Sequence, residues 1–170
     1  ILYSFGLKNI PLLELAILAS GFIIRLLIGA QETSITLSPW IIICSGLLSL
    51  MIAVGKRRND LKHQEKNNGP MRASLHGYNI EFLDHVNSML AGVNIVCYLL
   101  FCVSQYPFVS IGSNLLWTSP FVIFSILRYL QLTSINDLGE DPTAMLISDK
   151  TSIILFTIWL FLIMNIIYLN

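Results

Sequence analysis

Long stretches without a charged residue constrain the fold of this sequence more than any other feature. No Asp, Glu, Lys or Arg occurs between residues 85 and 127, and shorter stretches of the same kind lie on either side. Only 12% of the 170 residues are charged and the mean hydropathy is +0.71, whereas an ordinary soluble domain has roughly 25% charged residues. A water-soluble globule is therefore excluded, and the sequence predicts an all-α, polytopic bundle of transmembrane helices.

Five apolar segments are long enough to cross a bilayer, which takes about 20 residues of helix. The longest charge-free stretch must contain two of them, because polar and turn-forming residues interrupt it at 105–114. The predicted crossings are residues 10–30, 38–55, 84–106, 115–134 and 151–170, and the second and third are joined by a loop at 56–83. We therefore expect one membrane domain over residues 1–170.

The distribution of basic residues predicts how this domain is oriented. Lys and Arg are concentrated at 56–72, and neither occurs at 31–37 or 107–114. Cytoplasmic loops of membrane proteins carry an excess of Lys and Arg. We therefore expect a multi-pass protein of the cell (plasma or inner) membrane with the loop 56–83 in the cytoplasm.

Arg25 is the basic residue that conflicts with this orientation, because it lies inside the first predicted crossing. A charge there must face the bundle interior, a polar cavity or, by extending along the helix, the external interface. Glu14 lies on nearly the same helical face, but about 16 Å away along the axis at ~1.5 Å per residue. Glu14 is therefore excluded as a direct partner of Arg25.

Three consecutive cations, Lys56, Arg57 and Arg58, follow the second predicted crossing, and Asp60 comes just after them. Cations at one membrane edge can bind a phosphate or diphosphate through charge-assisted hydrogen bonds. They can equally hold the helix against anionic lipid, at about 1 kcal/mol per residue. The residues alone leave both interpretations open.

Other polar segments also have two interpretations. Asp84, Asn87, Ala91 and Asn94 recur at helical spacing and predict a face directed into the bundle, which either lines a cavity or bonds to neighbouring helices. The segment 72–83 is typical of an interfacial helix or a lid over a cytoplasmic cavity. The acidic stretch 137–141 is either a solvated loop that leads into a short helix or a Mg²⁺ site. The three His residues have no metal-site spacing.

Short fragments spread over nearly the whole chain carry a family resemblance. They are residues 3–8, 21–25 with Gly29 and Ala30, 38–40, 55–57, 72–75 with Tyr78, 120–122 with 127–129, and 139–143 with Asp149. Together they resemble the second half of UbiA-type membrane prenyltransferases, and within that superfamily the decaprenyl-phosphate phosphoribosyltransferases. The resemblance implies that the five crossings are helices five to nine of a nine-helix fold around a cavity open to the cytoplasm.

The resemblance also implies an activity. It implies a pentosyltransferase that moves a 5-phosphoribosyl group from phosphoribosyl pyrophosphate to a polyprenyl (decaprenyl) phosphate, releases pyrophosphate, uses Mg²⁺ and serves cell wall biosynthesis. The family's first Asp-rich motif, of the form NDxxDxxxD, binds Mg²⁺ and diphosphate in the other half and is absent from this sequence. We therefore expect an N-terminal half, on the same or a separate chain, and predict no confident metal ligand here. The formal net charge of zero gives no indication of a nucleic-acid partner.

The resemblance carries over to individual residues. Phosphate binding is expected of Lys8, Lys56, Arg57 and Arg72, and a supporting role of Tyr3, Tyr78, Asp60 and Arg25. Asp60 stands where the family often has Glu. Aromatic prenyltransferases of the superfamily carry a second DxxxD motif in the loop that corresponds to 56–83, but here cations occupy that place. Such a replacement fits substrates that bring more phosphate.

Two other functions stay open at this stage. One is a UbiA-type prenyltransferase that joins a polyprenyl diphosphate to an aromatic acceptor. The other is a non-catalytic membrane subunit or fragment whose motifs only stabilise a bundle. A requirement for prenyl diphosphate would select the first, and the absence of any partner half would favour the second.

Overall fold

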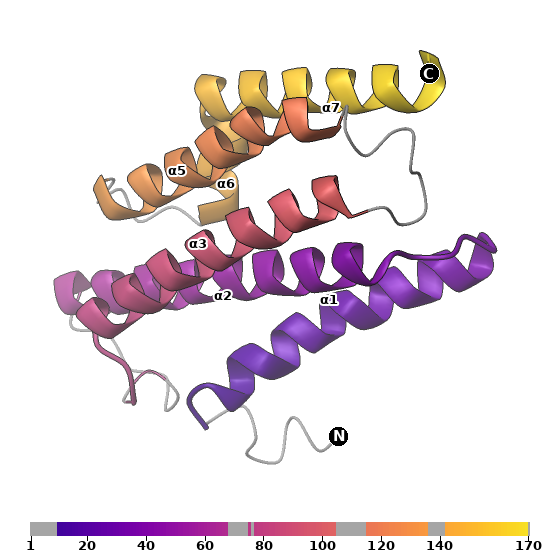
Figure 1. The fold of residues 1–170 in the computed structure, drawn as a ribbon. Helices are drawn as coiled ribbons and strands as arrows, with labels where there is room; N and C mark the ends of the chain where they lie inside the picture. The colour runs from indigo at the N-terminus through magenta and orange to yellow at the C-terminus, as the bar shows by residue number, and fades with distance from the viewer. Residues whose placement is uncertain (1–9, 68–74, 76, 105–114, 136–141, 170) are drawn as a thin grey trace.

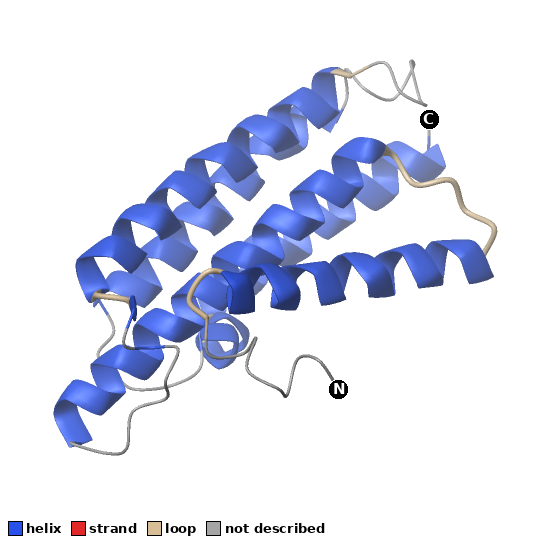
Figure 2. Ribbon diagram, turned by 90° about the horizontal axis from the view of Figure 1, so that it is seen from below, coloured by secondary structure: helices blue, strands red, loops and turns tan. Residues whose placement is uncertain are grey.

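All regular structure in the described part of the chain is helical (Figures 1 and 2). The computed structural model describes residues 10–67, 75, 77–104, 115–135 and 142–169. Its helices are α1 (Leu13–Glu32), α2 (Pro39–Asn67), α3 (Ile80–Val103), the 3₁₀ turn η4 (Leu116–Thr118), α5 (Ser119–Ile135), α6 (Pro142–Ser148) and α7 (Lys150–Leu169). A long helix occupies each of the five predicted crossings, so the predicted all-α helix bundle is confirmed.

Three of these helices have the length and composition of membrane-spanning segments. Within the described residues they are α1, α2 up to Gln64, and α3, and the apolar part of α7 at Lys150–Ile166 is shorter. Large apolar side chains point outward from the bundle, among them Phe22, Leu100 and Phe161. Such a surface suits lipid rather than water. The chain is therefore a multi-pass membrane protein, and crossings by α5 and α7 remain predictions.

The structure corrects the end of the second predicted crossing. The stretch from Lys56 to Asn67, which we expected to be loop, continues α2 as helix. Its sequence contains no Gly or Pro, and Arg57 and Asp60 form an ion pair one helical turn apart. The charged residues mark the end of the apolar segment, but the helix continues past them. The prediction that the helix ends at these charges was therefore wrong.

The helix starts follow from local sequence. Asn79 accepts a hydrogen bond on Oδ1 from the Phe82 N–H at 2.6 Å, so α3 begins at Ile80 rather than at the predicted residue 84. Ser38 accepts one from the Trp40 N–H at 3.3 Å, just before Pro39 opens α2. Residues 80–83 of the predicted interfacial lid are thus part of α3. Residues 72–74 and 76 lie outside the described residues.

The helices pack in chain order, with α1 against α2, α2 against α3, α3 against α5, and α5 against α7 (Figure 1). The short α6 contacts α2, α5 and α7. The buried core joins the middle of this series, and it contains Met51, Val54, Leu83, Leu90, Ile126 and Tyr129. Leu75 and Leu83, which lie in the segment predicted to be an interfacial helix or a lid, belong to this core. The arrangement brings together the end of α2 and the starts of α1 and α3.

An ion pair connects α5 to the start of α7. The Arg128 guanidinium donates to both carboxylate oxygens of Asp149, at 3.1 and 2.7 Å. Asp149 Oδ2 also accepts from the Ser152 N–H at 2.8 Å and thereby caps α7. The hydrogen bonds from Arg128, together with those from Ser152, hold the pKa of the Asp149 carboxyl well below its usual range.

Asp149 is therefore expected to stabilise the protein in a pH-dependent way. A carboxyl whose pKa is lowered by folding stabilises the fold above its unfolded pKa of about 3.9, and this stabilisation is lost as the pH falls through the folded value. Asp149→Asn should lower the thermal unfolding temperature in detergent by a constant amount above about pH 5. The difference should shrink below about pH 4. An equal difference at pH 3 and pH 7, followed by circular dichroism, would contradict this.

Candidate functional site

The arginine at position 57 joins α1 to α2 at one end of the bundle. Its guanidinium forms an ion pair with Glu14 of α1, and its Nη1 donates to Asp60 Oδ2 of its own helix at 2.6 Å. The side chains of Arg57 and Glu14 are 8% and 3% exposed, whereas that of Asp60 is 29% exposed. Arg57 is therefore bound by one carboxylate from inside the protein and by another nearer the surface.

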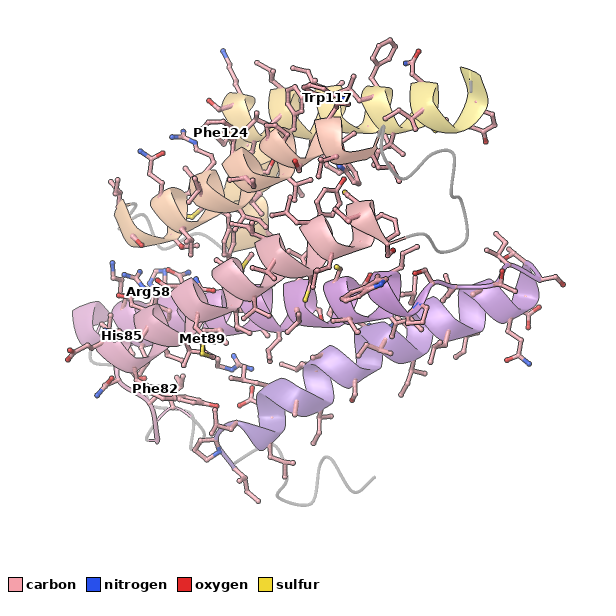
Figure 3. The ribbon with its side chains drawn as sticks, in the orientation of Figure 1. Arg58, Phe82, His85, Met89, Trp117 and Phe124 are labelled. Atoms are coloured by element: carbon pink, nitrogen blue, oxygen red, sulfur yellow. The ribbon has the colours of Figure 1, made fainter. Side chains whose placement is uncertain are left out.

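Arg58 joins α2 to two further helices. It forms an ion pair with Asp84 of α3, and its Nη1 donates to the backbone carbonyl of Thr133 at 2.6 Å in the last turn of α5. Figure 3 shows Arg58 at the end of α2 where α3 begins, with Phe82 and His85 at the same end. The two arginines thus connect α2 to α1, α3 and α5.

The segment before α3 packs against the start of α1. The buried Tyr78 hydroxyl accepts a hydrogen bond from the Leu12 N–H, and its ring stacks on Phe82 with a centroid distance of 6.3 Å. Gly77 lies directly against Pro11. We call Leu12, Glu14, Arg57, Asp60 and Tyr78 the α1–α2 junction. Three segments that are distant in the sequence meet there.

Gly77 is expected to be required for this contact. A Cβ added at Gly77 would lie 2.3 Å from Cγ of Pro11, a ring atom that cannot rotate away. Gly77→Ala should therefore cost about 1–3 kcal/mol of unfolding free energy by overpacking. Gly92→Ala is the matched control, because a Cβ there meets nothing within 4 Å. In a helix interior that change should stabilise by about 0.5–1 kcal/mol. Equal effects of the two variants in detergent unfolding would contradict the packing argument.

Four of the eight predicted site residues lie in or beside the junction. Lys56 is exposed on α2, next to the junction, whereas Arg57, Asp60 and Tyr78 are members of it. Asp60 contacts Arg57, the geometry that an orienting role requires. Tyr3, Lys8 and Arg72 lie outside the described residues. The phosphate-binding assignments stay predictions.

Arg25 lies apart from the junction. It is exposed on α1, and its guanidinium carbon is 5.6 Å from the ring centroid of Phe22, one turn earlier. Among the residues that the structure describes, no carboxylate forms an ion pair with Arg25. The distance along the helix already excluded Glu14 as a partner of Arg25, and Glu14 instead binds Arg57.

The polar face predicted on α3 does point into the bundle. Asn87, Ala91 and Asn94 are buried, and Asn94 donates to the Leu90 carbonyl of its own helix at 3.0 Å.

Two shallow depressions lie at the surface, at the start of α3. One is lined by Ile80, Glu81, Asp84, His85 and Ser88, and the other by Gly77, Tyr78, Asn79 and Phe82. The surface at the start of α3, beside Tyr78 of the junction, is therefore shallowly hollowed.

The carboxylates at this end do not fit a magnesium site by themselves. Glu14 and Asp60 both bind Arg57, and Asp84 binds Arg58. Within the described ranges no group of three His, Cys, Asp or Glu side chains is close enough to hold a metal ion. Ligands for Mg²⁺ would have to come from elsewhere.

The roles of Glu14 and Arg58 were not predicted from the sequence. That of Glu14 was visible in principle, since α1 and α2 are consecutive membrane helices and the start of the first must lie at the same membrane side as the end of the second. A carboxylate in the first turn of an apolar helix needs a cation at that depth, and Arg57 was available there. The contact between Arg58 and the Thr133 carbonyl has no sequence signal.

Several of the similar proteins found by comparison are named decaprenyl-phosphate phosphoribosyltransferase. The protein from Corynebacterium glutamicum is 31% identical over 169 residues, which is 98% of this chain and 50% of the relative. The protein from Mycolicibacterium smegmatis is 32% identical over 166 residues, 93% of this chain and 52% of the relative. The protein from Mycobacterium tuberculosis is 29% identical over 162 residues, 93% of this chain and 51% of the relative.

The chain thus spans about half the length of the relatives it matches. No protein-family model matches it. The resemblance to decaprenyl-phosphate phosphoribosyltransferases is confirmed along nearly the whole chain, and a match to one half of such a protein fits the alignment lengths. Placement in the UbiA-type superfamily stays a prediction.

Proposed function

We propose that this chain is one half of a membrane transferase of the decaprenyl-phosphate phosphoribosyltransferase kind. Nearly all of the chain aligns with such proteins, and the alignment covers about half the length of each. The enzyme moves a 5-phosphoribosyl group from phosphoribosyl pyrophosphate to a polyprenyl phosphate and releases pyrophosphate. The observation that carries the proposal is the α1–α2 junction, because it brings together three segments that each carry or adjoin a predicted phosphate ligand.

Chain length limits how far those ligands can lie from the junction. Lys8 precedes Leu12 by four residues and Arg72 precedes Tyr78 by six. At a maximum of ~3.6 Å per residue, their backbones lie within about 14 and 22 Å of these positions. Lys56 is adjacent to Arg57 in α2. The connectivity of the chain is therefore compatible with all three cations binding one phosphate group.

Cations at this position suit the proposed chemistry. In the transfer, an oxygen of the lipid phosphate attacks the anomeric carbon of the donor while the bond from that carbon to the diphosphate breaks. The diphosphate leaves with the bonding electrons and gains negative charge. Lys56 and its neighbours stabilise that charge by charge-assisted hydrogen bonds. Arg57 contributes either directly, by exchanging Asp60 for a phosphate oxygen, or by holding the end of α2 in place.

The remaining parts of the proposal concern the setting. When bound, Mg²⁺ would neutralise the diphosphate. Its ligands would come from outside the described residues, either from the acidic stretch 137–141, which lies outside them, or from the half that this chain does not match. The junction faces the cytoplasm, where the basic segment 56–83 is expected by its charge. The enzyme lies in the cell membrane, with a role in cell wall biosynthesis.

The test uses the complete reading frame that contains this chain, purified in detergent with Mg²⁺. Phosphoribosyl pyrophosphate labelled in the ribose is incubated with a polyprenyl phosphate, and label is measured in the organic phase. We expect label in the lipid only when the acceptor is present, and loss of label when Mg²⁺ is chelated. A folded enzyme that labels no lipid would contradict the proposal.

The same preparation separates the other functions. A polyprenyl diphosphate with an aromatic acceptor replaces the two substrates in a parallel reaction. Product there, with none from phosphoribosyl pyrophosphate, would select an aromatic prenyltransferase. No product in either reaction would favour a non-catalytic membrane subunit.

A further inference from the structure

Glu14 is the most deeply buried carboxylate that the proposed mechanism does not use. Its side chain is 3% exposed, and one carboxylate oxygen forms the ion pair with Arg57. Among the described residues, its other oxygen and Nε of Arg57 have no hydrogen-bond partner. The pair joins two helices across 43 residues of sequence. Glu14 therefore fixes Arg57 from the interior of the protein.

Stability alone does not account for this pair. Burying two charges costs several kcal/mol of desolvation per ion, and an apolar pair of similar volume often stabilises a fold as well or better. What an apolar pair cannot do is hold a guanidinium in one orientation next to the exposed Lys56. The side chain of Asp60 is nearly ten times more exposed than that of Glu14, and it contacts the outer side of the same guanidinium.

We propose that Glu14 is a positioning residue of the transferase. Its carboxylate holds Arg57, and through the α2 backbone also Lys56, at the start of α1 next to the segment that carries Lys8. The outer contact of Arg57 with Asp60 is the one that a substrate phosphate reaches first, while the inner contact with Glu14 persists during binding. This inference rests on the proposed phosphoribosyl transfer.

The test compares steady-state kinetics of variants of the complete enzyme. Glu14→Gln keeps the size of the side chain but removes its charge, and should raise KM for phosphoribosyl pyrophosphate at least ~10-fold, as expected for a lost charged hydrogen bond. Glu14→Asp keeps the charge on a shorter side chain and should give an intermediate KM, at least about threefold above wild type. Assays are run below the unfolding temperature of every variant.

Asp149→Asn is the matched control, because it also breaks an ion pair between two helices, α5 and α7. It should lower the unfolding temperature and leave KM unchanged. A KM for Glu14→Gln within twofold of wild type, or an equal rise in Asp149→Asn, overturns the positioning role and leaves the transferase intact. If Glu14→Gln does not fold, a wild-type KM in Glu14→Asp overturns it. A folded wild-type enzyme that transfers no label overturns the proposed function and this inference with it.

Discussion

Phosphoribosyl transfer by the complete enzyme is expected to fall at least ~100-fold when Lys56 is replaced by alanine. Removal of one donor that stabilises developing negative charge in an active site typically costs 10²–10³ in rate. The Lys56 side chain is exposed on α2, and alanine is a good helix former, so the unfolding temperature should not fall. Label transferred per minute and thermal unfolding, measured on the same preparation, check the two parts.

Two further variants separate a local role from general electrostatics. Lys150→Ala removes an exposed cation at the start of α7 and should leave the rate within about twofold. Lys56→Arg keeps the charge but not the compact ammonium, and should retain part of the activity. A rate for Lys56→Ala close to that of wild type, or an equal loss in Lys150→Ala, would remove Lys56 from the site.

The largest effect on stability is expected from Arg57→Leu. The change leaves Glu14 buried with no cation, and breaking a buried ion pair by removing one partner typically costs about 3–5 kcal/mol. In the double variant Glu14→Leu with Arg57→Leu no charge is left uncompensated, so most of that loss should be recovered. The free energy of unfolding in detergent, obtained from denaturant titration, measures both values.

The same double variant should recover stability without recovering transfer, since it also removes the group that positions Lys56. Arg128→Leu is the stability control, because the side chains of its ion pair with Asp149 are 28% and 15% exposed and solvent screens such a pair. Its loss should be smaller than that of Arg57→Leu. A double variant as unstable as Arg57→Leu alone would mean that packing, rather than the unpaired carboxylate, determines the loss.

The sequence was sufficient for the helices, because membrane helices are recognised from long apolar segments that need no tertiary information. The inward face of α3 was predicted from helical spacing, which also needs no tertiary information. Asn87 and Asn94 are buried as expected. The predicted end of α2 was wrong because charged residues indicate contact with water, whereas the end of a helix depends on capping residues and on Gly or Pro. At α3 such a residue, Asn79, set the start of the helix.

The candidate site was predicted in part. The sequence predicted that Lys56 and Arg57 follow the apolar part of one helix, but not which carboxylate a cation there binds. Arg57 binds Glu14 across 43 residues, and Arg58 binds a backbone carbonyl of α5. Such pairings depend on the angles at which helices cross, and these follow from side-chain packing over the whole bundle.

The length of α2 sets the depth at which the two proposed substrates meet. Lys56 follows Pro39 by 17 residues, which is about 26 Å of helix at ~1.5 Å per residue. The hydrocarbon layer of a bilayer is about 30 Å thick, so Lys56 lies near its boundary with the headgroups, and the rest of the helix, to Asn67, extends beyond it. A water-soluble sugar donor and the phosphate of a lipid acceptor can therefore react at this level, while the sugar stays hydrated and the prenyl tail stays among the acyl chains.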